Sequence, residues 1–229
     1  SALGGNFLFD KSDPTTQGNF QLNYAYRIPL NYDNMYLSFG IGAKLMYYNL
    51  DFSPDDIPPG EDNAFSANSY EKIFGDASSG VYLYANNFYF GFSSSNLLEA
   101  SFNTPVYGSP HSNSRIRQYY YLGGYRFHVN NKDWQLEPSF LFRTPKGFNT
   151  ISDLTMRVLY LEDTWLGLTY RTDQTGIFAF GFRSGSIHFS YSYDHTFAGD
   201  IQKYTYGTHE IGVAFQIQNI SKTRHIRSW

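Results

Sequence analysis

The sequence predicts an all-β fold, a transmembrane antiparallel β-barrel with about 12 strands in this chain, from three observations. Apolar and polar side chains alternate along segment after segment, which places them on opposite faces of a strand. Most of these segments approach or exceed the roughly 9–11 residues with which a β-strand crosses a bilayer. Aromatic residues make up 20% of the 229 residues, with 21 Tyr and 21 Phe but 3 Trp. Aromatic rings of this kind gather at both membrane interfaces of a barrel.

The composition excludes several other classes of protein. The formal net charge is −3, so the chain has no basic excess of the kind that binds nucleic acid. The sequence has no run of about 18 apolar residues, which excludes a helical membrane protein. Without cysteine, disulfides, thiolate metal sites and cysteine nucleophiles are excluded. A soluble sandwich, with the apolar faces turned inward, is the alternative fold.

The alternation is clearest in the last strand. Its odd positions from 211 to 217 are apolar and its even positions are polar or small, so we expect this stripe to face lipid: Ile211, Val213, Phe215 and Ile217. A second stripe comprises Phe178, Phe180 and Phe182. The same period divides the chain into twelve expected strands, at 2–9, 17–29, 35–50, 77–86, 88–94, 116–129, 133–144, 150–161, 164–172, 176–183, 186–194 and 204–218.

The connections between these strands alternate between shorter and longer ones, as periplasmic turns and external loops do in outer-membrane barrels. We assign the short ones to the periplasm: 30–33, 86–87, 130–132, 162–163 and 184–185. The long loops 51–76 and 95–115 then lie outside. Trp134 and Trp165 each follow a short turn, where we expect them to anchor the barrel at the interface. The barrel is expected to span 1–218, and 219–229 to form a basic periplasmic tail.

A search for catalytic or metal-binding groups finds no convincing set. His188, Ser190 and Asp194 share one strand face, but they spread over about 20 Å at roughly 3.3 Å per residue. Five acids of the first long loop offer oxygen ligands for calcium, although prolines interrupt any EF-hand spacing: Asp51, Asp55, Asp56, Glu61 and Asp62. A solvated external loop is the favoured interpretation of these acids. We expect no enzyme, cofactor or small-molecule substrate.

Charged residues on the polar face are expected to form a lumen network. Its members are Arg143, Asp153, Arg157, Arg171, Asp194 and Glu210. In a plausible hairpin register, Asp153 lies opposite Arg143 on one side and Arg171 on the other. Such pairs stabilise neighbouring strands, whereas an anion-selective pore would also be lined with arginine and lysine.

The two long loops are the candidate partner-binding surface. Aromatic and acidic residues punctuate their polar sequence, at Phe52, Asp55, Asp56, Phe65, Tyr70, Phe74, Phe102 and Tyr107. Aromatic anchors on loops held by a rigid scaffold are typical of binding faces. A lid folded over the barrel mouth is the alternative interpretation.

The last hairpin carries a specific motif, Tyr191-Ser192-Tyr193-Asp194 followed by Gly207-Thr208-His209-Glu210-Ile211. This motif resembles the PorP/SprF family, outer-membrane barrels associated with type IX secretion and gliding in Bacteroidota. Further similar stretches are Asp10-Lys11 to Pro14-Thr15, Tyr24 to Leu30, Glu137-Pro138-Ser139 and Trp165 to Arg171.

The resemblance implies a non-enzymatic outer-membrane component that supports secretion or surface attachment of a partner. Its partners would be membrane lipid and either other type IX components or an exported adhesin. Members of the family begin with a further stretch, so the resemblance implies about 14 strands, with two before Ser1. A passive, porin-like diffusion channel is the alternative function.

Overall fold

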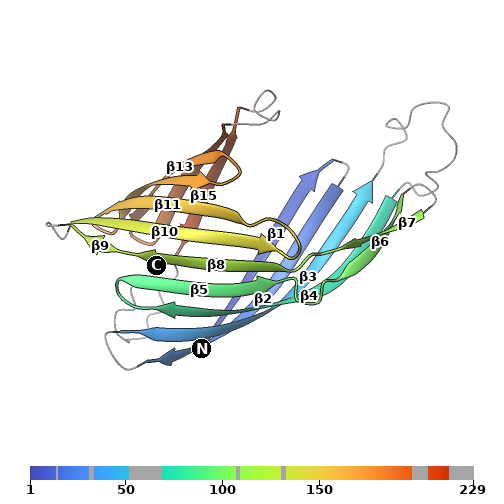
Figure 1. Ribbon diagram of the computed structural model, residues 1–229, viewed down its shortest axis with the longest axis horizontal. Helices are drawn as coiled ribbons and strands as arrows, with labels where there is room; N and C mark the ends of the chain where they lie inside the picture. The colour runs from blue at the N-terminus through green and yellow to red at the C-terminus, as the bar shows by residue number, and fades with distance from the viewer. Residues whose placement is uncertain are drawn as a thin grey trace. The chain divides into compact units, whose positions relative to one another are not determined.

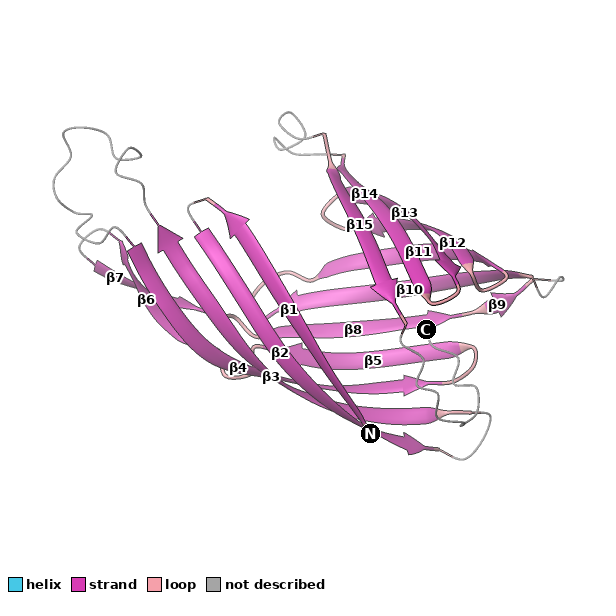
Figure 2. Ribbon diagram, turned by 180° about the vertical axis from the view of Figure 1, so that it is seen from behind, coloured by secondary structure: helices cyan, strands magenta, loops and turns pink. Residues whose placement is uncertain are grey.

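The computed structural model of the chain describes residues 1–13, 15–30, 34–51, 69–106, 109–129, 133–197 and 206–216, except the side chains of 69–70 and 102–114. All the regular secondary structure in these residues is β-strand (Figures 1 and 2). The described residues contain no helix that is long and apolar enough to cross a membrane.

One antiparallel sheet contains most of the strands. Its path runs through β1 (Ala2–Ser12), β2 (Thr15–Pro29), β3 (Tyr36–Asp51), β4 (Ser69–Tyr84), β5 (Phe88–Ser95), β8 (Gln118–Tyr125), β10 (Trp134–Pro145), β11 (Ile151–Tyr160), β12 (Thr164–Arg171), β13 (Thr175–Ser184), β14 (Ile187–Thr196) and β15 (Thr208–Phe215). The short β9 (Phe127–His128) pairs with β10. A separate hairpin consists of β6 (Ser101–Val106) and β7 (Ser109–Ser114). The predicted all-β antiparallel class and the twelve consecutive strands of the path are confirmed.

Three predicted boundaries are wrong. β4 begins at Ser69, so the predicted loop 51–76 is shorter by eight residues. The predicted loop 95–115 contains the β6–β7 hairpin, whose Ser-, Asn- and Pro-rich sequence shows no alternation. The predicted strand 116–129 is interrupted at Arg126, between β8 and β9.

The extra length of β4 has a physical reason. β3 and β4 are 16 residues long, about 54 Å at roughly 3.4 Å per residue. Crossing an apolar band of about 25 Å at a 45° tilt takes about 35 Å of strand. The two strands are thus long enough to continue beyond the apolar band, where the charges of Glu71 and Lys72 fit. Asp76 is 4% exposed and lies on the inward face opposite Lys44. These three charged residues hide the strand in the sequence.

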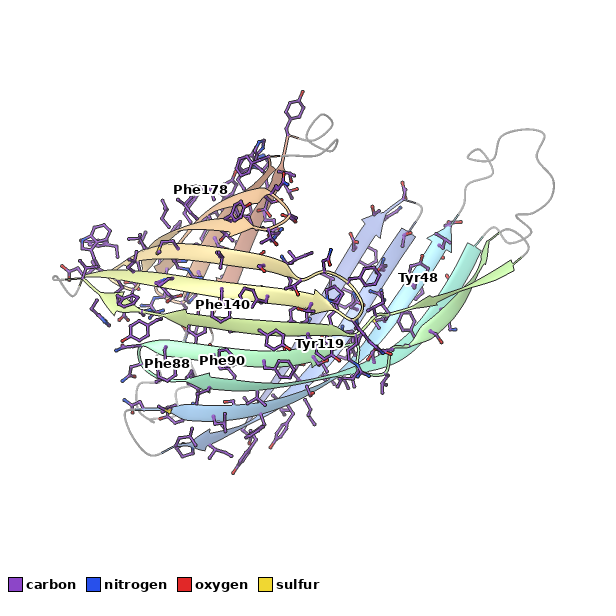
Figure 3. The ribbon with its side chains drawn as sticks, in the orientation of Figure 1. Tyr48, Phe88, Phe90, Tyr119, Phe140 and Phe178 are labelled. Carbon is purple, nitrogen blue, oxygen red and sulfur yellow. The ribbon has the colours of Figure 1, made fainter. Side chains whose placement is uncertain are left out.

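The chain divides into two compact units, Ser1–Gly124 with Phe140–Ser152 and Tyr125–Ser139 with Asp153–Trp229. In each unit, one sheet face carries exposed apolar side chains, and we call it the outward face; the opposite face is the inward face. In the first unit the rings of Phe90 and Phe140 (Figure 3) cover Gly123, where an added Cβ would lie 2.8 Å from the Phe140 ring. Close packing of rings on the strand thus requires a glycine there.

The predicted stripes lie on the outward face of the second unit. Phe178, Phe180 and Phe182 pair across strands with Tyr193, Tyr191 and Phe189. On β15, Ile211, Val213 and Phe215 are 72%, 57% and 71% exposed. An extensive apolar surface of this kind is unusual for a protein in water and normal for one in a membrane. Ile217 lies outside the described residues.

The first unit has an apolar cluster on its inward face. Met46 and Phe74 are cross-strand partners and are 2% and 9% exposed. Tyr48 and Ala100 pack against them. Phe74 is therefore a buried strand residue, and its predicted place in a partner-binding loop is wrong.

The face assignment predicts that Val213→Arg destabilises the protein by about 2–4 kcal/mol when position 213 is near the bilayer midplane, because the charge enters hydrocarbon. Ser192→Arg is the control, since Ser192 pairs on the inward face with Glu210 and the new charge meets an acid. Urea unfolding in lipid vesicles measures both. Normal assembly of Val213→Arg together with failure of Ser192→Arg would invert the two faces.

Candidate functional site

The inward face of the second unit carries a network of ion pairs. Asp153 and Arg171 are partners in the β11–β12 register, and the Arg171 Nε lies 2.9 Å from Asp153 Oδ1. The same guanidinium lies 4.0 Å from Asp194, so it connects β11 with β14 across β12 and β13. The predicted Asp153–Arg171 pair is confirmed. Arg143 belongs to the other unit, and its pairing with Asp153 stays a prediction.

Glu137 is the most buried acid of this network, at 2% exposure. Arg126 donates two hydrogen bonds to its Oε2, of 2.9 and 2.6 Å. Arg157 lies 3.6 Å from Oε1. No pairing of Arg126 with Glu137 was predicted from the sequence. The short turn predicted at 130–132 is the signal that could have paired them, because a tight hairpin brings such positions opposite each other.

Trp165 lies on the inward face, and its predicted role as an interface anchor is wrong. The Arg157 guanidinium carbon lies 5.0 Å from the centre of the Trp165 ring, within the range of a cation–π interaction. Gly181 makes room for the indole, since an added Cβ would lie 2.6 Å from Trp165 Nε1. Trp134, in contrast, is 47% exposed and packs on Tyr160, as expected of an anchor.

The motif of the last hairpin is divided between the two faces. On the outward face, the hydroxyl of Tyr191 is 2.7 Å from His209 Nδ1, and the rings of Tyr193 and His209 are 4.8 Å apart. On the inward face lie Asp194 and Glu210. Within the described residues Glu210 has no ion-pair partner, so its predicted membership in the network is limited to proximity to Asp194.

Gly207 explains why the motif requires glycine. Its φ of +101° is a conformation that side chains disfavour, and an added Cβ would lie 2.5 Å from the Asp194 carbonyl oxygen. This close approach lets the Tyr193 hydroxyl donate to the Tyr206 carbonyl at 2.6 Å. The chain then enters β15 with His209 beside Tyr191.

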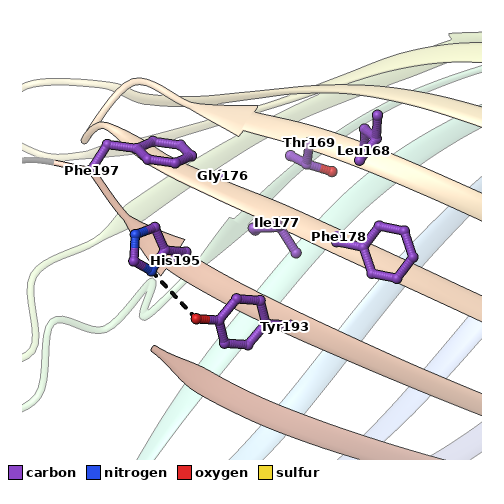
Figure 4. A pocket seen from close by; sticks show the side chains of 8 residues that line it. All are labelled: Leu168, Thr169, Gly176, Ile177, Phe178, Tyr193, His195 and Phe197. Atoms are coloured by element: carbon purple, nitrogen blue, oxygen red, sulfur yellow. Dashed lines mark hydrogen bonds between the residues drawn. The ribbon is translucent and has the colours of Figure 1, made fainter. Parts of the chain in front are cut away.

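A groove of about 450 Å³ lies beside this cluster (Figure 4). Its lining residues are Leu168, Thr169, Gly176, Ile177, Phe178, Tyr193, His195 and Phe197. The Tyr193 hydroxyl is 3.4 Å from His195 Nδ1, but no carboxylate belongs to the lining. The groove is a feature of the outward apolar face and lacks an acid–base pair for hydrolysis.

The other candidate residues are not brought together. His188, Ser190 and Asp194 lie on β14 opposite Arg183, Gly181 and Ile177, respectively. The described part of the chain contains no group of three or more His, Cys, Asp or Glu that could hold a metal ion. Of the loop candidates, Phe52, Asp55, Asp56, Phe65 and Tyr107 lie outside the described residues; so do the acids Glu61 and Asp62. Tyr70 and Phe102 lie in β4 and β6, with side chains outside the description.

The sheet and the motif agree with a comparison against protein families. The model of the family described as type IX secretion system membrane protein PorP/SprF matches residues 1–215. The chain belongs to this family. It is therefore a type IX secretion membrane protein, and the fold class predicted from the sequence, a membrane β-barrel, is that of the family. A search of curated proteins gave no match.

The Glu137 geometry predicts that Glu137→Gln lowers the free energy of unfolding by about 3 kcal/mol, because two arginines lose their counter-charge. This value is the lower end for a broken buried pair, since the Arg157 side chain is 35% exposed. Glu210→Gln, a control on the same face, should change stability by no more than about 0.5 kcal/mol. Equal urea-unfolding midpoints of the two variants would contradict this account.

The backbone at Gly207 predicts that Gly207→Ala costs about 1–3 kcal/mol or more, from backbone strain together with the clash against Asp194. Gly185 is the matched control, with a φ of +60° and nothing within 4 Å of an added Cβ. Gly185→Ala should cost about 1 kcal/mol, from backbone conformation alone. Thermal unfolding in detergent compares the two, and a larger loss for Gly185→Ala would refute the proposed role of the close approach.

Proposed function

We propose that this PorP/SprF protein lies in the outer membrane of a Bacteroidota cell and holds an exported protein at the cell surface. It acts as a scaffold for that partner and not as an enzyme. The support comes from membership in a family of type IX secretion membrane proteins and from the chemistry of the two ends and the inward face of its strands.

The observation that carries the proposal is the mutual neutralisation of charges on the inward face. Arg171 is paired with Asp153, and Arg126 with Glu137. Both acids are buried. Arg171–Asp153 joins β12 to β11, and Arg157, 3.6 Å from Glu137, joins β11 to β10, so these charges stabilise the sheet. A binding site for a charged ligand needs charged or polar side chains that converge on a cavity and are not neutralised by one another. The paired geometry therefore favours a structural interior and directs attention to the strand ends.

β3 ends at Asp51 and β4 begins at Ser69, on either side of residues 52–68 in the sequence, and we call these two paired strand ends the stalk. Both strands exceed the length needed to cross the membrane, by about 19 Å on the estimate above. Near the end of the stalk, the Tyr47 hydroxyl donates to Glu71 Oε1 at 2.9 Å. A loop joined to rigid paired strands suits the capture of a partner. The proposed partner-binding residues there are Phe52, Asp55, Asp56, Phe65 and Tyr70; Phe102 and Tyr107 belong to the β6–β7 region.

Replacement of residues 53–68 by a short Gly/Ser connection tests this function. The replacement ends before Ser69, so β4 and the Tyr47–Glu71 contact stay intact. We expect the variant to assemble in the membrane but to lose exported protein from the cell surface into the medium, as measured by surface labelling and mass spectrometry.

The matched control replaces the short turn 130–132 by Gly/Ser residues, which should leave surface retention unchanged. Unchanged retention in the 53–68 variant would refute the proposal. If the intact protein also gave a large, steady conductance in planar bilayers, a passive diffusion channel would be the better description.

A further inference from the structure

Two apolar side chains are buried where a membrane barrel is normally polar and wet. Met46 and Phe74 lie on the inward face of β3 and β4, yet they are 2% and 9% exposed. Tyr48 of β3 packs beside them, but cover from above has to come from outside the two strands, because side chains stand roughly perpendicular to a sheet. Ala100 packs against the pair, and the guanidinium carbon of Arg115 lies 5.9 Å from the centre of the Phe74 ring. The cover thus comes from residues between β5 and β8.

We call these covering residues the strap, defined as Asn96–Ala100 together with Arg115–Arg117. Its two parts lie side by side, since the Arg115 N–H donates to the Ala100 carbonyl at 3.1 Å and the Asn96 side chain donates to the Ile116 carbonyl at 3.1 Å. These bonds lie within the first unit and fix the strap as one piece.

The first residues of the strap are attached to the inward side of β4. The Leu97 N–H donates to the Ala77 carbonyl at 3.0 Å, and the Leu98 N–H donates to Asp76 Oδ1 at 3.0 Å. Asp76 is 4% exposed and is the register partner of Lys44 on the inward face. The chain that leaves β5 is therefore turned over the inward face and not away from it.

The other part of the strap reaches a strand two places further along the sheet. The Arg115 guanidinium donates to Gln17 Oε1 of β2 at 2.9 Å. Strands are about 4.8 Å apart, so the path from β4 to β2 covers about 10 Å of the inward face. A bond of this kind holds the strap across three strands.

Glu99 fastens the strap from the side. Both of its carboxylate oxygens lie 3.0 Å from Lys146 Nζ, and Arg117 Nε lies 3.6 Å from Oε1. Arg117 in turn donates to the Leu97 carbonyl at 2.7 Å. Glu99 adopts a φ of +49°, an unfavourable conformation that persists when surrounding contacts impose it.

The acidity of Glu99 supports this role. The hydrogen bond from Lys146, with the charges of Lys146 and Arg117, lowers the pKa of Glu99 below its ordinary value. A carboxyl group with a lowered pKa stabilises the folded contact fully above its ordinary pKa. That contribution disappears as the pH falls through the lowered value.

We propose that the strap is a built-in closure of the inward face, fastened by Glu99 and Arg115, which restricts ion flow through the lumen until these contacts are released. The inference goes beyond the proposed surface scaffold, because it concerns the interior of the protein. The two can fail separately, since surface retention does not enter the experiment below.

The absence of cysteine from the chain allows a direct test with single thiols. Met46→Cys reports on the covered patch, and Ser38→Cys, on the same face and strand but away from the strap, is the control. In vesicles, a water-soluble thiol reagent should modify Met46→Cys at least about tenfold more slowly than Ser38→Cys, because it reacts only after the strap opens.

Release of the strap should change two measurements together. Glu99→Gln or Arg115→Gln should raise the modification rate of Met46→Cys about tenfold towards that of Ser38→Cys. The same substitutions, without the reporter thiol, should raise single-channel conductance in planar bilayers. Lys146→Met provides a third release variant, which leaves the strap sequence intact.

Three outcomes would overturn the proposal. One is equal modification of Met46→Cys and Ser38→Cys in the otherwise unchanged protein. Another is no change of rate in any release variant. The third is faster modification of Met46→Cys without any rise in conductance, which would show that the strap covers the patch but does not restrict ions.

Discussion

Backbone hydrogen bonds must stay inside the sheet wherever a strand contacts hydrocarbon, because lipid tails offer neither donors nor acceptors. Because of this constraint, the strands of the main sheet pair with their neighbours in one antiparallel order from β1 to β15, without β6, β7 and β9. It also divides the side chains by parity. Outward positions such as Phe180 and Val213 are apolar, and the positions between them turn towards the polar interior.

The inward face then has to accommodate polar groups without a conventional core. In the second unit it does so with ion pairs centred on Glu137 and Asp153, each buried beside arginine. In the first unit it does so with the strap, whose bonds to Asp76 and Gln17 cover Met46 and Phe74. Both arrangements tie strands together from inside, and neither presents an acid–base pair suited to catalysis.

The sequence predicted the parts of the fold that follow from the alternation of side chains between the two faces of a strand. The lipid-facing stripe of β13 and the Asp153–Arg171 pair needed no more than a period of two and a short turn. The prediction for Trp165 was wrong because it was based on the position of this residue after a turn. Trp165 and Arg171 are six residues apart on one strand and therefore share its inward face, which should have decided the prediction. The start of β4 was missed because charged Glu71 and buried, apolar Phe74 break the alternation there.

The strap was the least predictable feature. Its contacts join residues far apart in the sequence, such as Gln17 with Arg115 and Glu99 with Lys146. They depend on the left-handed conformations of Asn96 and Glu99. Asparagine adopts this conformation more readily than most residues, but nothing in the sequence indicates it for Glu99. The prediction of an external loop at 95–115 was reasonable from composition but could not reveal its inward turn.

The central claim is that alternate residues of each strand contact lipid and the polar interior. Single spin labels at positions 166–170 of β12, in lipid vesicles, test it most directly through collision rates with oxygen and with a water-soluble nickel complex. The account predicts oxygen maxima at Leu166, Leu168 and Tyr170, and nickel maxima at Gly167 and Thr169. Maxima in the opposite positions, or no alternation along the five residues, would contradict it.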